Sequence, residues 1–159
     1  MDPGCVTSEA DEATGSNPHR FCESLVRLFS RTRAALSSEK AMQTDIAAAL
    51  VAAGIPFERE YRLSRTDIPD FLIPMPGDLT QGERPPTGPS PAHGVAVECK
   101  LKGRGGGPRK IDIYRQIERY ARHPDIAAII LASNLSMGLP AEIGGKPVYA
   151  ASLSMGWLV

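Results

Sequence analysis

The sequence is poor in aromatic residues and carries no net charge. Aromatic residues make up 6% of its 159 positions, and 18 lysines and arginines balance 18 aspartates and glutamates. The overall charge therefore gives no sign of a nucleic-acid partner. A content of 15 glycines and 14 prolines beside 42% hydrophobic residues indicates an ordered core next to long irregular segments. The length fits one domain.

Long hydrophobic runs are also missing. The longest, residues 46–55 and 126–132, are much shorter than the roughly 20 residues that cross a bilayer. Residues 1–17 include four acidic residues, no lysine or arginine, and no apolar stretch, which does not fit a secretory signal. We therefore expect a cytoplasmic protein with no membrane partner.

Soft metal ligands are scarce and scattered. The cysteines are Cys5, Cys22 and Cys99, and the histidines are His19, His93 and His123. The sequence has no CxxC motif, and no histidine pair with metal-ligand spacing accompanies the cysteines. This pattern predicts neither a disulfide framework nor a zinc site, so we interpret the cysteines as reduced thiols.

The order of elements indicates one α/β domain after a short tail. Residues 1–17 are small, polar and acidic, which is typical of a disordered segment, and the domain spans 18–159. Apolar periodicity predicts helices over about 18–33, 38–53 and 111–123, and strands over 57–63, 68–73, 94–102, 126–131 and 148–153. The proline- and glycine-rich residues 74–93 predict a mobile loop. The helix between the third and fourth strands predicts a parallel crossover.

Several predicted element ends have a specific signal. Asn17 followed by Pro18 is typical of a helix N-terminus, and either Ser37 or Ser38 can cap the second helix. Gly54 then predicts the end of that helix. A Gly144-Gly145 pair predicts a turn before the last strand.

Two predicted strands carry charged residues in alternation with apolar ones. Glu98 and Lys100 project to one side of their strand, because side chains alternate between the two faces. Pairing this strand with the preceding one brings Asp70 into the same patch. Two carboxylates beside a cation suit a hard divalent ion such as Mg²⁺. The alternative is a turn residue at Asp70 and a solvated ion pair on an edge strand.

Pro69-Asp70 followed by Glu98-Cys99-Lys100 resembles the signature of the PD-(D/E)XK nucleases. The order of elements is similar to the αβββαβ core of that family, which implies a restriction-endonuclease-like mixed sheet flanked by helices. Gln116 and Tyr120 match the QxxxY pattern of its RecB-like branch, and the size resembles that of small resolvase-like members. The resemblance covers about residues 37–133.

The resemblance implies a site for Mg²⁺, with Mn²⁺ as a substitute. Its implied ligands are Asp70, Glu98, the backbone carbonyl of Cys99, and Glu39. Glu58 and Glu60 are alternatives to Glu39, and an acid in the first turn of a helix is stabilised by the helix dipole whatever its function. Such an ion polarises the scissile phosphate and lowers the pKa of a bound water.

The implied catalytic residues are Asp70, Glu98, Lys100, Gln116 and Tyr120. Lys100 positions or deprotonates the attacking water. Gln116 and Tyr120 lie four residues apart, on one helix face, and orient Lys100, the metal waters or a phosphate. For Tyr120, a core ring with an exposed hydroxyl is the alternative.

Positive charge is concentrated between residues 100 and 123, where eight lysines and arginines face two acids. The candidates for nucleic-acid binding are Lys102, Arg104, Arg109, Lys110 and Arg115. A glycine-rich cationic segment that opens onto a helix suits contacts with backbone phosphates, and a merely solvated helix face is the alternative.

The sequence as a whole predicts a Mg²⁺-dependent deoxyribonuclease, a phosphodiester hydrolase of the endonuclease kind. A catalytically inactive nucleic-acid-binding or regulatory module with the same fold is the alternative. Because cutting both strands of a duplex commonly needs two sites, a homodimer is a further expectation.

Overall fold

The computed structural model describes residues 17–76, 93–102 and 106–153. The expected tail, apart from Asn17, and most of the expected loop at 74–93 lie outside these residues. The helices are α1 (Pro18–Arg31), α2 (Glu39–Ala52) and α3 (Lys110–Ala121). The strands are β1 (Glu58–Arg59), β2 (Phe71–Pro74), β3 (Gly94–Lys100), β4 (Ile126–Ser133), β5 (Glu142–Ile143) and β6 (Lys146–Ser152).

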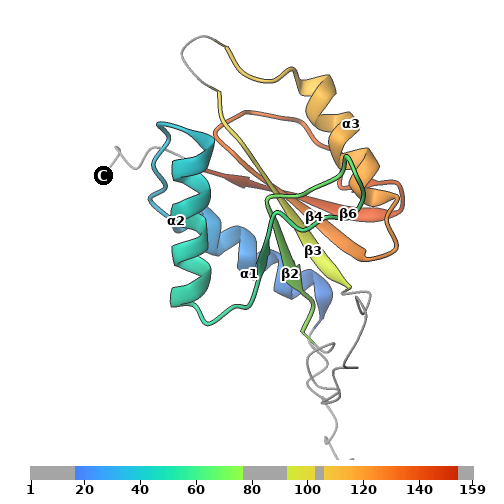
Figure 1. Cartoon of the computed structure of the whole chain (residues 1–159), viewed down its shortest axis with the longest axis horizontal. Coiled ribbons are helices and arrows are strands. Elements are labelled where there is room, and N and C mark those ends of the chain that lie inside the picture. Colours follow the sequence, from blue (N-terminus) through green and yellow to red (C-terminus); the bar gives the residue numbers. More distant parts are fainter. Residues whose placement is uncertain (1–16, 77–92, 103–105, 154–159) are drawn as a thin grey trace, which may run out of the picture.

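The strands form one mixed sheet in the order β1-β2-β3-β4-β6-β5. β3 pairs parallel to β4, and β4 pairs parallel to β6, which confirms the crossover through α3. β2 is antiparallel to both β1 and β3, and β5 is antiparallel to β6. One core joins the sheet to α1 and α2, and a second joins its other face to α3, so the sheet lies between two helical layers (Figure 1).

The helices begin where the sequence predicts. The side chain of Asn17 accepts a hydrogen bond from the backbone N–H of His19 at the start of α1, with Pro18 as the first helical residue. Ser38, rather than Ser37, caps α2 by accepting from the N–H of Ala41. Gly54 follows α2 with a φ of 67°, a left-handed conformation that glycine adopts without strain. Along the described chain, no helix is long and apolar enough to cross a membrane.

The central strands are buried on both faces. Val95, Val97 and Cys99 pack toward α1 and α2, and Ala96 packs toward α3. β4 is likewise buried along nearly its whole length, as its continuous apolar run predicts. Cys22 and Cys99 are buried free thiols, and Cys5 lies outside the described residues.

Two strand predictions differ most from the structure in their bounds, and one strand was missed. β1 is only two residues long, because Glu60 takes a φ of 51° and turns the chain out of the extended conformation. β2 begins at Phe71 instead of residue 68 and includes Pro74, which the sequence placed in the loop; Pro74 pairs with Gly94 at the end of the ladder. β5 was not predicted. It forms a short hairpin with β6 through the predicted Gly144-Gly145 turn.

Candidate active site

Strand register brings Asp70 and Glu98 together. Phe71 of β2 pairs with Val97 of β3 in an antiparallel ladder, so Asp70 lies opposite Glu98. Glu98 is 2% exposed on the central strand β3, where a charged side chain is stable only with partners. The two carboxylates therefore meet where β2 begins and β3 ends.

Asp70 receives one N–H donor on each carboxylate oxygen. The side-chain amide of Gln43 on α2 donates to Oδ1 at 2.8 Å. The backbone N–H of Cys99 donates to Oδ2 at 2.7 Å. In the main chain, the N–H of Glu60 donates to the carbonyl of Asp70 at 3.0 Å. Asp70 is thus attached to α2, β3 and the end of β1.

Three donors converge on Glu98. Its Oε1 lies 2.6 Å from Nζ of Lys100 and accepts from the amide of Gln116 at 2.9 Å. Its Oε2 accepts from the hydroxyl of Tyr120 at 2.8 Å, and Gln116 also donates to that hydroxyl. The two QxxxY side chains therefore hold Glu98. The alternative of an exposed Tyr120 hydroxyl is wrong, because the residue is 1% exposed and its hydroxyl is buried against Glu98.

The electrostatics of the site favour an added cation. Burial, followed by repulsion from Glu98, raises the pKa of Asp70 to about 7; the N–H of Cys99 and the charge of Lys100 oppose this rise, and Glu39 adds to it. Burial lowers the pKa of Lys100, but its ion pair with Glu98 and the nearby acids outweigh burial and raise it above the ordinary value. Burial and the charge of Glu98 also raise the pKa of the Tyr120 hydroxyl.

The donor set fits a hard divalent ion in its chemistry. Mg²⁺ takes one or two carboxylates and keeps several waters, and Asp70 and Glu98 supply two carboxylates whose mutual repulsion a cation would relieve. Within residues 17–76, 93–102 and 106–153, however, no three His, Cys, Asp or Glu side chains are grouped so that they could hold a metal. In this arrangement the ammonium of Lys100 provides the positive charge that faces Glu98.

The other predicted metal ligands differ in position. Glu39 reaches the site from the start of α2, where its Oε1 accepts from the N–H of Leu101 at 3.2 Å. Glu58 and Glu60 are exposed. The thiol of Cys99 is buried in the core, where burial raises its pKa, so only the backbone of this residue is available to an ion.

The predicted nucleic-acid-binding residues are partly gathered at the start of α3. Lys102, Arg109 and Lys110 line a hollow of about 550 Å³ together with residues 134–136. Arg109 is also paired with Asp112 at 2.8 Å. Arg115 is exposed on α3 outside the hollow, and Arg104 lies outside the described residues.

Two polar residues near the site were missed from the sequence. Gln43 follows Glu39 by one helical turn, which is the signal that marks it as facing the site. Asp67 is 7% exposed and accepts from Nε of Arg119 at 2.9 Å and from the hydroxyl of Ser64 at 3.0 Å. His123 Nε2 lies 3.1 Å from the same carboxylate. Asp67 thereby ties the segment before Asp70 to α3, and no sequence motif marks it.

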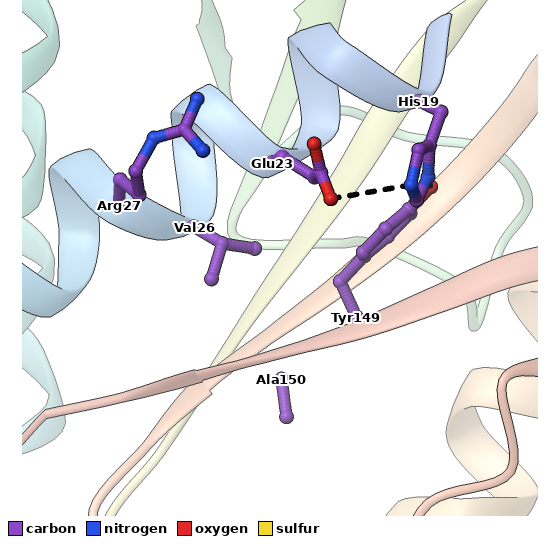
Figure 2. A pocket seen from close by; sticks show the side chains of 6 residues that line it. All are labelled: His19, Glu23, Val26, Arg27, Tyr149 and Ala150. Atoms are coloured by element: carbon purple, nitrogen blue, oxygen red, sulfur yellow. Dashed lines mark hydrogen bonds and ion pairs between the residues drawn. The ribbon is translucent and has the colours of Figure 1, made fainter.

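A second hollow, of about 380 Å³, lies between α1 and β6 and shares no residue with the site (Figure 2). Its polar members are His19, Glu23, Arg27 and Tyr149. His19 lies between Tyr149 and Glu23, with its Nδ1 2.7 Å from the hydroxyl of Tyr149 and its Nε2 3.2 Å from the carboxylate of Glu23. Burial, followed by the charges of Cys22 and Glu23, raises the pKa of the Tyr149 hydroxyl.

Comparisons of the chain with protein-family models, with curated proteins and with solved structures give no match. The residues of this chain and their arrangement therefore carry what can be inferred about its function.

Proposed function

We propose that the protein is a metal-dependent nuclease of the PD-(D/E)XK type, which hydrolyses phosphodiester bonds in DNA as an endonuclease. One observation carries the proposal: Asp70, Glu98 and Lys100 converge where β2 begins and β3 ends. Paired carboxylates beside a half-buried lysine are costly to fold, because the two like charges of the carboxylates repel each other at a partly buried site. Such a cluster is typical of a functional site.

In this proposal the carboxylates of Asp70 and Glu98 hold Mg²⁺ or Mn²⁺, with the carbonyl of Cys99 and the carboxylate of Glu39 as further ligands. When bound, the ion supplies a Lewis acid for the scissile phosphate and an activated water. Gln116 and Tyr120 keep Glu98 in one orientation through both of its oxygens. Their hydrogen bonds therefore act on the metal ligand rather than on the phosphate.

Lys100 acts as a positive charge in this proposal. Its raised pKa keeps the ammonium protonated at neutral pH, which favours positioning the water and balancing negative charge over removing a proton. The hollow with Lys102, Arg109 and Lys110 supplies contacts to DNA backbone phosphates. A homodimer is part of the proposal because a duplex presents two strands to cut.

The direct test is cleavage of plasmid, linear and branched DNA in the presence of Mg²⁺, Mn²⁺ or EDTA. We expect cleavage with either metal, none with EDTA, and a loss of at least about 100-fold in Asp70→Asn and Lys100→Ala. Arg62→Ala is the matched control, because it removes an exposed cation outside the site. Equal cleavage by the wild type and the folded site variants would overturn the catalytic assignment. DNA binding without cleavage would favour the inactive binding module.

A further inference from the structure

Asp70 depends on α2 for its orientation. Its Oδ2 is fixed by a backbone N–H, which comes with the fold of β3. Its Oδ1 is fixed by Gln43, the one side chain among the described residues that donates to this carboxylate. Without this donor, the hydrogen bond from Cys99 to Oδ2 alone restrains the rotation of the carboxylate about its last bond, and Oδ1 loses its fixed position.

A glutamine amide can present either its nitrogen or its oxygen, and Arg59 favours the orientation that Asp70 needs. The guanidinium of Arg59 donates to Oε1 of Gln43 at 3.4 Å, so the amide nitrogen is directed to Asp70. Arg59 in turn stacks over the ring of Phe71, with its Cζ 5.7 Å from the ring centroid. The short strand β1 thus reaches Asp70 through Gln43, and Glu60, the residue after β1, donates a backbone hydrogen bond to the carbonyl of Asp70.

We propose that Gln43, held in turn by Arg59, is a positioning residue that fixes the Asp70 carboxylate for metal binding. This inference rests on the proposed function. It also assigns a role to β1, whose two residues are both exposed and so add nothing to the hydrophobic core. Partners that orient metal ligands commonly change metal affinity by about 10- to 100-fold when they are removed.

The test is the affinity of the full chain for Mn²⁺, measured by titration calorimetry in the absence of DNA. Gln43→Leu removes the donor without changing charge, and we expect it to weaken Mn²⁺ binding about 10-fold. Thr44→Ala, an exposed change on the same helix, is its control and keeps the wild-type affinity. The thermal unfolding of the metal-free protein, measured in parallel, shows whether Gln43→Leu acts through the stability of the fold instead.

The variant Arg59→Ala distinguishes two effects of Arg59 on Mn²⁺ binding: positioning of Asp70 through Gln43, and direct repulsion between the Arg59 charge and the ion. Removing a nearby positive charge strengthens cation binding if charge alone matters. If Arg59 acts through Gln43, its removal weakens Mn²⁺ binding by about threefold, as expected for one modest hydrogen bond, and adds nothing once Gln43→Leu is present. Because Arg59 is exposed, this variant keeps the test valid even if Gln43→Leu does not fold. Arg62→Ala is its charge-matched control.

Each outcome is decisive. Unchanged affinity in folded Gln43→Leu, or tighter binding in Arg59→Ala, overturns the inference while leaving the proposed function standing, provided that Asp70→Asn abolishes Mn²⁺ binding. A wild-type protein with no Mn²⁺ binding, or with binding that Asp70→Asn does not reduce, overturns both.

Discussion

Asp70 makes stability depend on pH. Its ordinary pKa is 3.8, and burial with repulsion from Glu98 raises it to about 7 in the folded chain. Between about pH 4 and pH 7 the folded chain therefore holds a proton that the unfolded chain has released, so this residue lowers stability as pH rises through that range. The free energy of unfolding of the metal-free protein should therefore fall as pH rises from about 4 to about 7, by on the order of a few kcal/mol.

Urea unfolding at a series of pH values, without metal, measures this dependence. Asp70→Asn has no proton to bind, so its curve should be flatter, and the difference between the two curves isolates Asp70 from the other acids. Parallel curves for the two proteins would show that Asp70 does not titrate in this range.

In the proposed metal site, Lys100 competes with the ion for Glu98. Its ammonium lies 2.6 Å from Oε1, so a cation that binds this oxygen must displace it or share the oxygen with it. Lys100→Met should therefore bind Mn²⁺ more tightly, by about 10-fold, while losing cleavage. Lys102→Met removes an exposed charge two residues away and should change the affinity much less. Weaker binding in Lys100→Met would argue against competition.

At the level of elements, Asp67 joins the chain before β2 to α3. Asp67→Ala leaves Arg119 and His123 without their shared acceptor and should lower the free energy of unfolding by about 1–3 kcal/mol. Asp112→Ala removes a solvent-exposed ion pair with Arg109 and should change the free energy of unfolding much less. Urea unfolding measures the free energy of unfolding of both variants. Equal losses in the two variants would show that Asp67 contributes no more to stability than the exposed Asp112.

The elements differ in how well the sequence predicts them. The apolar stripe of Met42, Ile46 and Leu50 and the cap at Ser38 are local, so they predict α2 closely. β1 and β5 are two residues long, and pairing with distant strands defines them, so no local pattern of sufficient length exists.

The candidate site likewise combines residues that local sequence patterns predict with residues that only long-range contacts bring in. The alternation around Glu98 and Lys100 predicted their common face, and the register of β2 and β3 supplies Asp70. Gln43 is 27 residues away in sequence from its partner Asp70. Asp67 is 52 residues away from its partner Arg119. The spacing from Glu39 is the one local signal for Gln43, and nothing in the sequence distinguishes Asp67 from a solvated residue.

In the molecule as a whole, neutrality hides an uneven distribution of charge. Four acids lie in residues 1–17, whereas residues 100–123 carry an excess of six positive charges. Under the proposed function, DNA affinity should therefore depend on a local surface. Lys102→Ala and Lys110→Ala should each lower the salt dependence of binding by about one phosphate contact, and Lys40→Ala should not. Binding isotherms at several salt concentrations measure this, and an unchanged slope in both variants would exclude the hollow at α3.

The pairing of Pro74 with Gly94, extended by the hydrogen bond from the N–H of Met75 to the carbonyl of His93, places His93 at the opposite end of the β2–β3 pair from Asp70 and Glu98. Four residues of strand separate the two ends, roughly 13 Å. His93 is exposed and is therefore a suitable position for a fluorophore. A label attached at His93 begins away from the carboxylates, so it can report on the binding that the proposed function requires without displacing the bound molecule.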